Sequence, residues 1–205
     1  MLHNRCIRAV AVLAVVLFAY ASSAAEIPLN EAGRFVKALG DDAVTVLNTE
    51  EVGSARRSAR YRELLHRGFA IDIIARFVLG RYWRTASEEQ RRAYLGLFRE
   101  YVLDVYAARL DRYTGESFVI LKEQPLGDKD TMVSTEIRSP GGAPIRVDYR
   151  VRELGGGHKV IDVLVEGVSL ITTQRSEIAS IINRQGFDGL LELLRERTSP
   201  GLSSN

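Results

Sequence analysis

Apolar positions in the first part of the chain recur every three or four residues, which is the spacing of amphipathic helices. This pattern predicts a helix over 30–47 capped by Asn30, a basic helix over 54–67, and a short, very apolar helix over 69–79. The stripe of the first helix consists of Phe35, Val36, Leu39, Ala43, Val46 and Leu47. We therefore expect this part of the chain to be helical throughout.

A longer helix is predicted to begin at Ser87 and to end at Gly115. Ser87 and Gln90 have the spacing of a capping box, in which each side chain accepts a hydrogen bond from the other residue's backbone N–H. The apolar stripe of this helix is broad enough to face both a core and something else. Helical spacing returns at the end of the chain, over about 175–197.

Between these helical parts the period of the apolar pattern changes to two, which indicates strands. We expect four of them, over 117–121, 131–137, 145–152 and 159–166, joined by clusters of Gly, Pro, Asp and Ser. The third strand alternates cleanly, so one of its faces is expected to be wet and the other covered. The sequence thus predicts an α+β fold in which a twisted antiparallel sheet of four or five strands is wrapped by amino- and carboxy-terminal helices.

The amino terminus has the pattern of a secretory signal. A short basic stretch, an unbroken apolar run of ten residues over 9–18, and small residues over 21–25 follow one another. We expect residues 1–25 to be removed, which leaves one domain over 26–205. The apolar run is too short to span a bilayer, and no later stretch reaches the roughly 18 apolar residues that a transmembrane helix requires.

Charge and cysteine content exclude two classes of protein. The chain has 28 Lys plus Arg and 26 Asp plus Glu, and two of the arginines lie in the predicted signal, so the mature formal charge is near zero. A general nucleic-acid binder would be basic. The single cysteine, Cys6, also lies in the signal, so the mature chain cannot contain a disulfide framework and must be stabilised by packing.

The sequence contains few residues in catalytic arrangements. His158 and Asp162 are four residues apart on a predicted strand and could share a face, but a polar pair near a turn explains them as well. His66 suits the last turn of its helix, where it complements the helix dipole. The run 155–157 of three glycines leads into a strand, as in a hairpin, and not into a phosphate-binding helix. We expect no enzymatic activity, no metal site and no cofactor.

Two features leave alternatives open. The helix over 69–79 and the strand over 160–165 are apolar on more than one side, which fits either a fully packed core or a ligand cavity. The segment 52–84 contains eight arginines and two acidic residues, a local charge of +6. That segment is either a solvated helix face or a docking surface for an acidic partner or anionic lipid headgroups.

Specific motifs resemble a known family. Gly80-x-x-Trp83-Arg84 is followed by the Ser-x-x-Gln cap, and Asp162-Val163 precedes the run Glu-Gly-Val-Ser-Leu over 166–170. Together with Val-Asp-Tyr-Arg-Val over 147–151, they resemble the MlaC family of toluene-tolerance proteins across nearly the whole mature chain. A family associated with hopanoid synthesis shares the same signatures.

The resemblance implies a monomeric periplasmic lipid carrier without enzymatic activity. Such a carrier moves phospholipid between an outer-membrane lipoprotein complex and an inner-membrane ABC transporter, and so maintains outer-membrane lipid asymmetry. Its only bound group would be the lipid cargo, with the tails in an apolar cavity between sheet and helices. Three alternatives remain: a hopanoid-type lipid as cargo, a ligand-free protein-interaction adaptor, and a small hydrolase or isomerase that uses His158 and Asp162.

Within this interpretation the inward faces supply the candidate lipid-binding residues. They are Ile74, Phe77, Val78, Phe98, Val102, Val105, Val147, Tyr149, Val163, Val165 and Val168. We expect Trp83 to lock the helix junction, and Asp162 and Glu166 to satisfy backbone groups. The candidates for docking to a partner are Arg56, Arg57 and Arg60.

Overall fold

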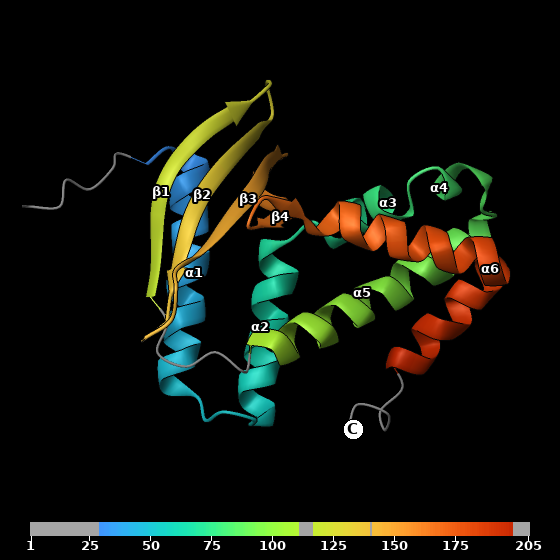
Figure 1. Cartoon of the computed structure of the whole chain (residues 1–205), viewed down its shortest axis with the longest axis horizontal. Coiled ribbons are helices and arrows are strands. Elements are labelled where there is room, and N and C mark those ends of the chain that lie inside the picture. Colours follow the sequence, from blue (N-terminus) through green and yellow to red (C-terminus); the bar gives the residue numbers. More distant parts are fainter. Residues whose placement is uncertain (1–28, 111–116, 140, 199–205) are drawn as a thin grey trace, which may run out of the picture.

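The computed structural model describes residues 29–110, 117–139 and 141–198 (Figure 1). The predicted signal over 1–25 and the predicted helix end at Gly115 lie outside these residues. The helices are α1 (Glu31–Thr49), α2 (Ala55–Gly68), α3 (Ile71–Leu79), α4 (Tyr82–Thr85), α5 (Glu88–Leu110) and α6 (Leu170–Thr198). The strands are β1 (Ser117–Leu126), β2 (Asp130–Arg138), β3 (Ile145–Leu154), β4 (Gly157–Val165) and β5 (Val168–Ser169).

The predicted caps at Asn30 and Ser87 are confirmed, and Ser54 caps α2 in addition. Asn30 Oδ1 accepts the N–H of Gly33 at 3.0 Å, and Ser54 accepts the N–H of the residue three positions later at 3.1 Å. The capping box before α5 is complete, since the Ser87 and Gln90 side chains each accept the other's backbone N–H at 3.1 Å. These caps satisfy amide groups that have no partner inside the helix.

Two helix boundaries differ from the prediction. α3 begins at Ile71 because Phe69 forms a bridge with Val160 of β4, and the N–H of Ala70 donates to the Val160 carbonyl at 2.9 Å. α6 begins earlier than predicted, because the Ser169 hydroxyl caps it by accepting the Thr172 N–H at 3.1 Å. Apolar periodicity alone cannot place such ends, because they depend on a neighbouring strand or a single cap.

The sheet is an antiparallel meander with the order β1-β2-β3-β4-β5, as predicted. β1 continues through Pro125, where the sequence predicts a turn; Pro125 pairs with Thr131. Proline is tolerated there because β1 is an edge strand, so a missing N–H need not break the ladder. Figure 1 shows the long strands twisted and curved around α1.

The helices cover the sheet in two groups. α1 lies along one face of the sheet, and α2, α3, α5 and α6 form a helical part beside it, with β4 next to that part (Figure 1). α6 bends at Gly186, where φ is 73°. This angle is not helical, and residues with a side chain rarely adopt it. As a result, the second half of α6 folds back toward α5 (Figure 1).

The buried apolar residues form two separate clusters. The larger cluster lies among the helices and includes Tyr61, Tyr94 and Phe98. The smaller one joins α1 to the sheet and consists of Ala32, Val36, Val133 and Val151. The chain therefore has one core among its helices and another under its sheet, and the space between them holds the candidate site.

Candidate lipid cavity

A cavity of about 370 Å³ lies between α1, α2, α3, α5 and the concave side of the sheet. This volume is in the range of ligand pockets, roughly 300–1,000 Å³. Apolar side chains from helices and strands that are far apart in the sequence form most of its wall. The residues that line it are Val36, Leu39, Gly40, Ala43, Val44, Leu47, Tyr61, Leu64, Leu65, Phe69, Ile71, Ile74, Val78, Phe98, Val102, Tyr106, Arg109, Leu110, Ser117, Phe118, Ile137, Val147, Tyr149, Asp162, Val163, Val165, Leu170, Ile171 and Gln174.

Most of the predicted lipid-binding residues lie in this wall. The structure brings together eight of the eleven: Ile74, Val78, Phe98, Val102, Val147, Tyr149, Val163 and Val165. They come from α3, α5, β3 and β4. Their direct contact with a lipid stays a prediction.

The other three predicted residues do not line the cavity. On α3 the wall is formed by Ile71, Ile74 and Val78, and Phe77 is one position away from Val78. The centre of the Phe77 ring lies 5.8 Å from the guanidinium carbon of Arg152. Val105 is absent from the wall, to which α5 contributes Phe98, Val102, Tyr106, Arg109 and Leu110. Val168 is 60% exposed on the short edge strand β5, so it faces solvent. Contact of Phe77 and Val105 with a lipid stays a prediction, whereas the exposure of Val168 argues against an inward position.

A β-bulge in β4 corrects a second expectation. Strict alternation places Val160 and Val163 on opposite faces, but the pairing with β3 shifts by one residue at Ile161. Val160 pairs with Val151, and Val163 pairs with Tyr149, so both valines share the face of those two partners. The bulge thus brings Val160, Val163 and Val165 to one face of β4.

The same bulge separates His158 from Asp162, the two residues whose spacing in the sequence suggested a pair. The ring of His158 lies 6.3 Å from that of Phe35 in α1. Asp162 is opposite Arg150 in the register of β3 and β4. Its carboxylate accepts hydrogen bonds from backbone N–H groups and a hydroxyl group. Within the described residues, the two side chains therefore do not form a catalytic pair.

The wall contributed by α1 and α2 is absent from the predicted site. The apolar stripe of α1 was recognised in the sequence, but nothing in it distinguishes a cavity wall from a core face. Gly40 of α1 lies directly against Phe118 of β1. A Cβ at position 40 would be only 2.6 Å from the Phe118 ring, which is too close. Its lack of a side chain lets α1 approach β1 closely at the edge of the cavity.

Comparison with known proteins assigns the chain to a family. A family model described as MlaC protein matches residues 37–196, which is more than half of the 205 residues. The chain belongs to the MlaC family. The resemblance found in the sequence motifs is thereby confirmed.

Two curated relatives are similar over part of their length. The chain is 30% identical over 132 residues to the intermembrane phospholipid transport system binding protein MlaC of Haemophilus influenzae, with 62% of each chain covered. It is 25% identical over 108 residues to the toluene tolerance protein ttg2D of Pseudomonas putida, covering 53% of this chain and 50% of the relative. The chain therefore spans between half and two thirds of these relatives.

A solved structure has the same fold. It is the phospholipid-binding protein from Ralstonia solanacearum in complex with a phospholipid, with a TM-score of 0.71 and 24% sequence identity. The match covers 82% of this chain and 97% of that one. The two chains thus share their α+β architecture.

The motifs that carry the family resemblance have structural roles here. The guanidinium carbons of Arg76 and Arg91 lie 4.8 and 5.4 Å from the centre of the Trp83 ring, and Arg91 Nε also donates to the Trp83 carbonyl at 2.8 Å. These contacts tie α3, α4 and α5 together, as expected for a residue that locks the junction.

The acidic residues of the second MlaC-family motif satisfy backbone groups, as predicted. Asp162 Oδ1 accepts the N–H of Val163 at 2.8 Å and of Ile171 at 3.3 Å, and Oδ2 accepts the Ser169 hydroxyl at 2.7 Å. Glu166 accepts the N–H of Arg146 at 2.6 Å from a turn in which Glu166 and the following glycine both have positive φ. This motif therefore fixes the passage from β4 to α6.

The predicted docking residues do not form one exposed patch. Arg57 is 1% exposed and donates to the Glu50 carbonyl at 3.3 Å, so its place in a docking surface was wrong. The side chain points inward because position 57 shares the buried face of α2 with Tyr61. Arg56 and Arg60 are exposed, and their part in docking stays a prediction.

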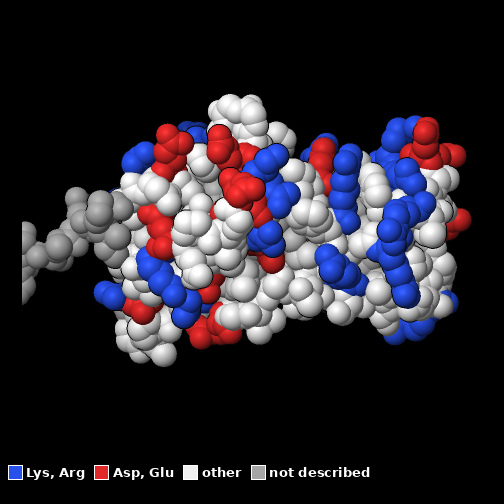
Figure 2. Space-filling view, turned by 90° about the horizontal axis from the view of Figure 1, so that it is seen from above, with Lys and Arg blue, Asp and Glu red and all other residues white. Residues whose placement is uncertain are grey.

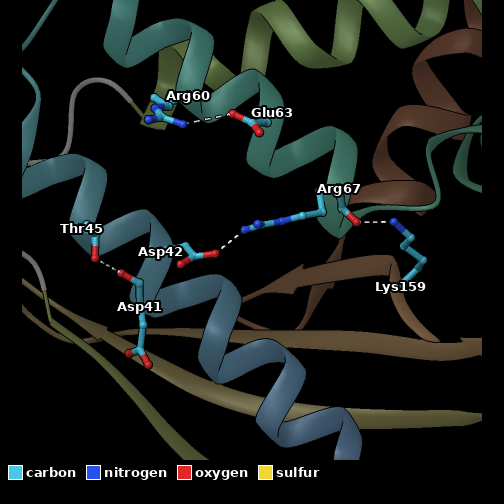
Figure 3. Close-up of polar contacts among 7 residues, drawn as sticks. All are labelled: Asp41, Asp42, Thr45, Arg60, Glu63, Arg67 and Lys159. Atoms are coloured by element: carbon cyan, nitrogen blue, oxygen red, sulfur yellow. Dashed lines mark hydrogen bonds and ion pairs between the residues drawn. The ribbon is translucent and has the colours of Figure 1, made fainter. Parts of the chain in front are cut away.

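A second, more polar hollow of about 260 Å³ lies between the outer sides of α1 and α2. Figure 3 shows its contacts: Arg60 Nη1 lies 3.4 Å from Glu63 Oε2, Arg67 pairs with Asp42, and Lys159 donates to the Arg67 carbonyl. These exposed pairs link α1, α2 and β4 on the far side of the cavity wall. Opposite charges already meet here, so the hollow has no surplus cationic face.

The surface charges are unevenly distributed. Figure 2 shows basic side chains gathered at the end of the molecule formed by α4 and α6, whereas acids and bases are mixed over the sheet. Arg81 and Arg84 of the predicted basic segment are exposed near α4, away from Arg56 and Arg60 in α2. No helix in the described part of the chain is long and apolar enough to cross a membrane.

Proposed function

We propose that this chain is a periplasmic carrier that binds one two-tailed phospholipid in the cavity and transfers it between the outer and inner membranes. The observation that carries the proposal is an apolar cavity lined by helices and the sheet, in a chain of the MlaC family. The Haemophilus influenzae relative is a phospholipid transport binding protein and the Ralstonia solanacearum structure holds a phospholipid, which supports the same cargo.

The physical demand on such a carrier fits the composition of the wall. Each methylene that leaves a bilayer loses about 0.8 kcal/mol of hydrophobic stabilisation, so a cavity must replace most of that burial for both tails. A wall of Val, Leu, Ile and Phe offers this without hydrogen-bonding groups that the tails could not satisfy. The charged headgroup can remain in water outside the cavity.

The partners belong to the proposal as well. The carrier would receive or deliver lipid at an outer-membrane lipoprotein complex and an inner-membrane ABC transporter, and so maintain outer-membrane lipid asymmetry. It would act as a monomer without enzymatic activity, with the lipid as its only bound group. Arg56 and Arg60 are exposed and are the candidates for these contacts that remain.

The decisive experiment is to purify the full chain natively and to identify bound lipid by mass spectrometry of the intact complex and of its organic extract. One two-tailed phospholipid per chain is the expected result. A triterpenoid would keep the carrier function but change the cargo to a hopanoid-type lipid. An empty protein, even after incubation with phospholipid vesicles, would refute the carrier and favour a protein-interaction adaptor.

A further inference from the structure

Only two charged residues in the described part of the chain line the cavity, Arg109 and Asp162. They differ in how their charges are used. The Asp162 carboxylate accepts two backbone N–H groups and one hydroxyl, so it serves the fold. Arg109 has no carboxylate partner among the described residues, which leaves its guanidinium available for an anion.

The position of Arg109 suits a ligand that projects from the cavity. It lies in the last turn of α5, it is exposed, and its guanidinium carbon lies 5.1 Å from the centre of the Tyr106 ring. Tyr106 also lines the cavity, so the ring supports the guanidinium where apolar wall meets solvent. Burial raises the pKa of Tyr106, so its hydroxyl stays neutral.

Other arginines of the neighbouring helices are engaged differently. Arg62 pairs with Glu100 and Asp104, and Arg99 pairs with Asp72. A cation at the carboxyl end of a helix complements the helix dipole, which is a structural role that Arg109 also has. The helix-dipole role does not explain why Arg109 also lies in the cavity wall.

We propose that Arg109 binds the phosphate group of the cargo at the mouth of the cavity, and thereby sets the direction in which the lipid enters. A guanidinium presents a fork of N–H donors that matches two phosphate oxygens. The inference rests on the proposed function, because the tails must occupy the cavity for the phosphate to reach this rim. The same donors could attract free phosphate, and the experiment must separate the two sources.

The test compares two lipids with identical tails, dioleoyl phosphatidic acid and dioleoylglycerol, which differ in the phosphate. The full chain is incubated with an equimolar mixture in detergent, and the retained ratio is measured by mass spectrometry. We expect the unmodified chain to favour the phosphate-bearing lipid, and Arg109→Gln to reduce this preference about tenfold, equivalent to about 1.4 kcal/mol. Arg109→Lys should restore part of it, since charge remains but the fork is lost.

The matched control is Arg184→Gln, which removes an exposed arginine of α6 outside the cavity wall and should leave the ratio unchanged. An equal ratio in the unmodified chain and Arg109→Gln would overturn the inference while leaving the carrier in place. Retention of neither lipid by the unmodified chain would instead overturn the carrier. Calorimetric binding of inorganic phosphate that Arg109→Gln abolishes, with no effect on the lipid ratio, would assign the residue to free phosphate and also overturn the inference.

Discussion

A charge placed in the cavity wall should abolish lipid binding without unfolding the protein. Val163 of β4 is the best position, because it lines the cavity and is partly exposed. Val147 is less suitable, since it is only 5% exposed and a charge there would destabilise the fold itself. The perturbation is therefore Val163→Asp.

The expected magnitude follows from what bound tails would do to the introduced carboxylate. In the empty cavity this carboxylate would keep contact with water, whereas lipid tails would remove that water and leave the charge without a partner. Uncompensated burial of an ion costs several kcal/mol, and the lost valine contact adds about 1.5–2 kcal/mol. A total on the order of 5 kcal/mol corresponds to a loss of affinity of more than about 1,000-fold.

The assay is uptake of radiolabelled phospholipid from vesicles, with circular dichroism to verify folding. Val168→Asp is the matched control: it introduces the same charge on β5, at a position that is 60% exposed and outside the cavity wall. We expect this control to bind lipid normally. A folded Val163→Asp protein that takes up lipid like the unmodified chain would show that tails do not occupy this cavity.

Three predictions concern stability. Asp130 is 5% exposed and accepts hydrogen bonds from Arg150 and Arg152. The Arg152 hydrogen bonds lower the pKa of Asp130. Asp130→Asn should therefore reduce the free energy of unfolding by about 1–3 kcal/mol above about pH 4. Because the folded-state pKa lies below the unfolded value, denaturant titrations should show this difference vanish as pH falls through the lowered pKa. Tyr94→Phe loses the buried hydrogen bond to the Ala75 carbonyl, and thermal unfolding should report a loss of about 1 kcal/mol. Ser87→Ala removes the α5 cap and should cost about 1 kcal/mol in the same assay, and no change would mean that water replaces it.

Local signals predicted most of the fold. Caps such as Asn30 and Ser87 act within four residues, and the change of period after α5 is a property of adjacent residues, so both can be found in the sequence. The exceptions depend on distant partners. Proline at 125 fits its strand only because β1 is an edge, and the start of α3 depends on pairing with β4. Neither the edge position of β1 nor the pairing with β4 can be predicted from neighbouring residues.

The cavity could be predicted only in part, for the same reason. Helical and strand periodicity identified apolar faces, but they do not say which faces meet across a gap. The bulge in β4 moves Val163 to the face of Val160, and no residue in that stretch signals the shift. Arg57 shows the converse error, because a basic segment suggests solvent while the helix phase at that position points inward.

The division of the core into two clusters leads to a last prediction. One cluster lies among the helices, the other joins α1 to the sheet, and the cavity lies between them, so bound tails would complete packing that the chain alone leaves divided. Lipid should therefore stabilise the folded state, by about 2.7 kcal/mol when its concentration is 100 times the dissociation constant. For a protein of this size that is roughly 5–10 °C in Tm.

Calorimetry of the same preparation before and after lipid extraction measures this shift, and Val163→Asp provides the control because it should show none. The shift should also return when phospholipid is added back, which distinguishes ligand binding from damage during extraction. An unchanged Tm with lipid demonstrably bound would mean that the lipid binds the unfolded chain as well as the folded one, and would refute binding that completes the packing between the two cores.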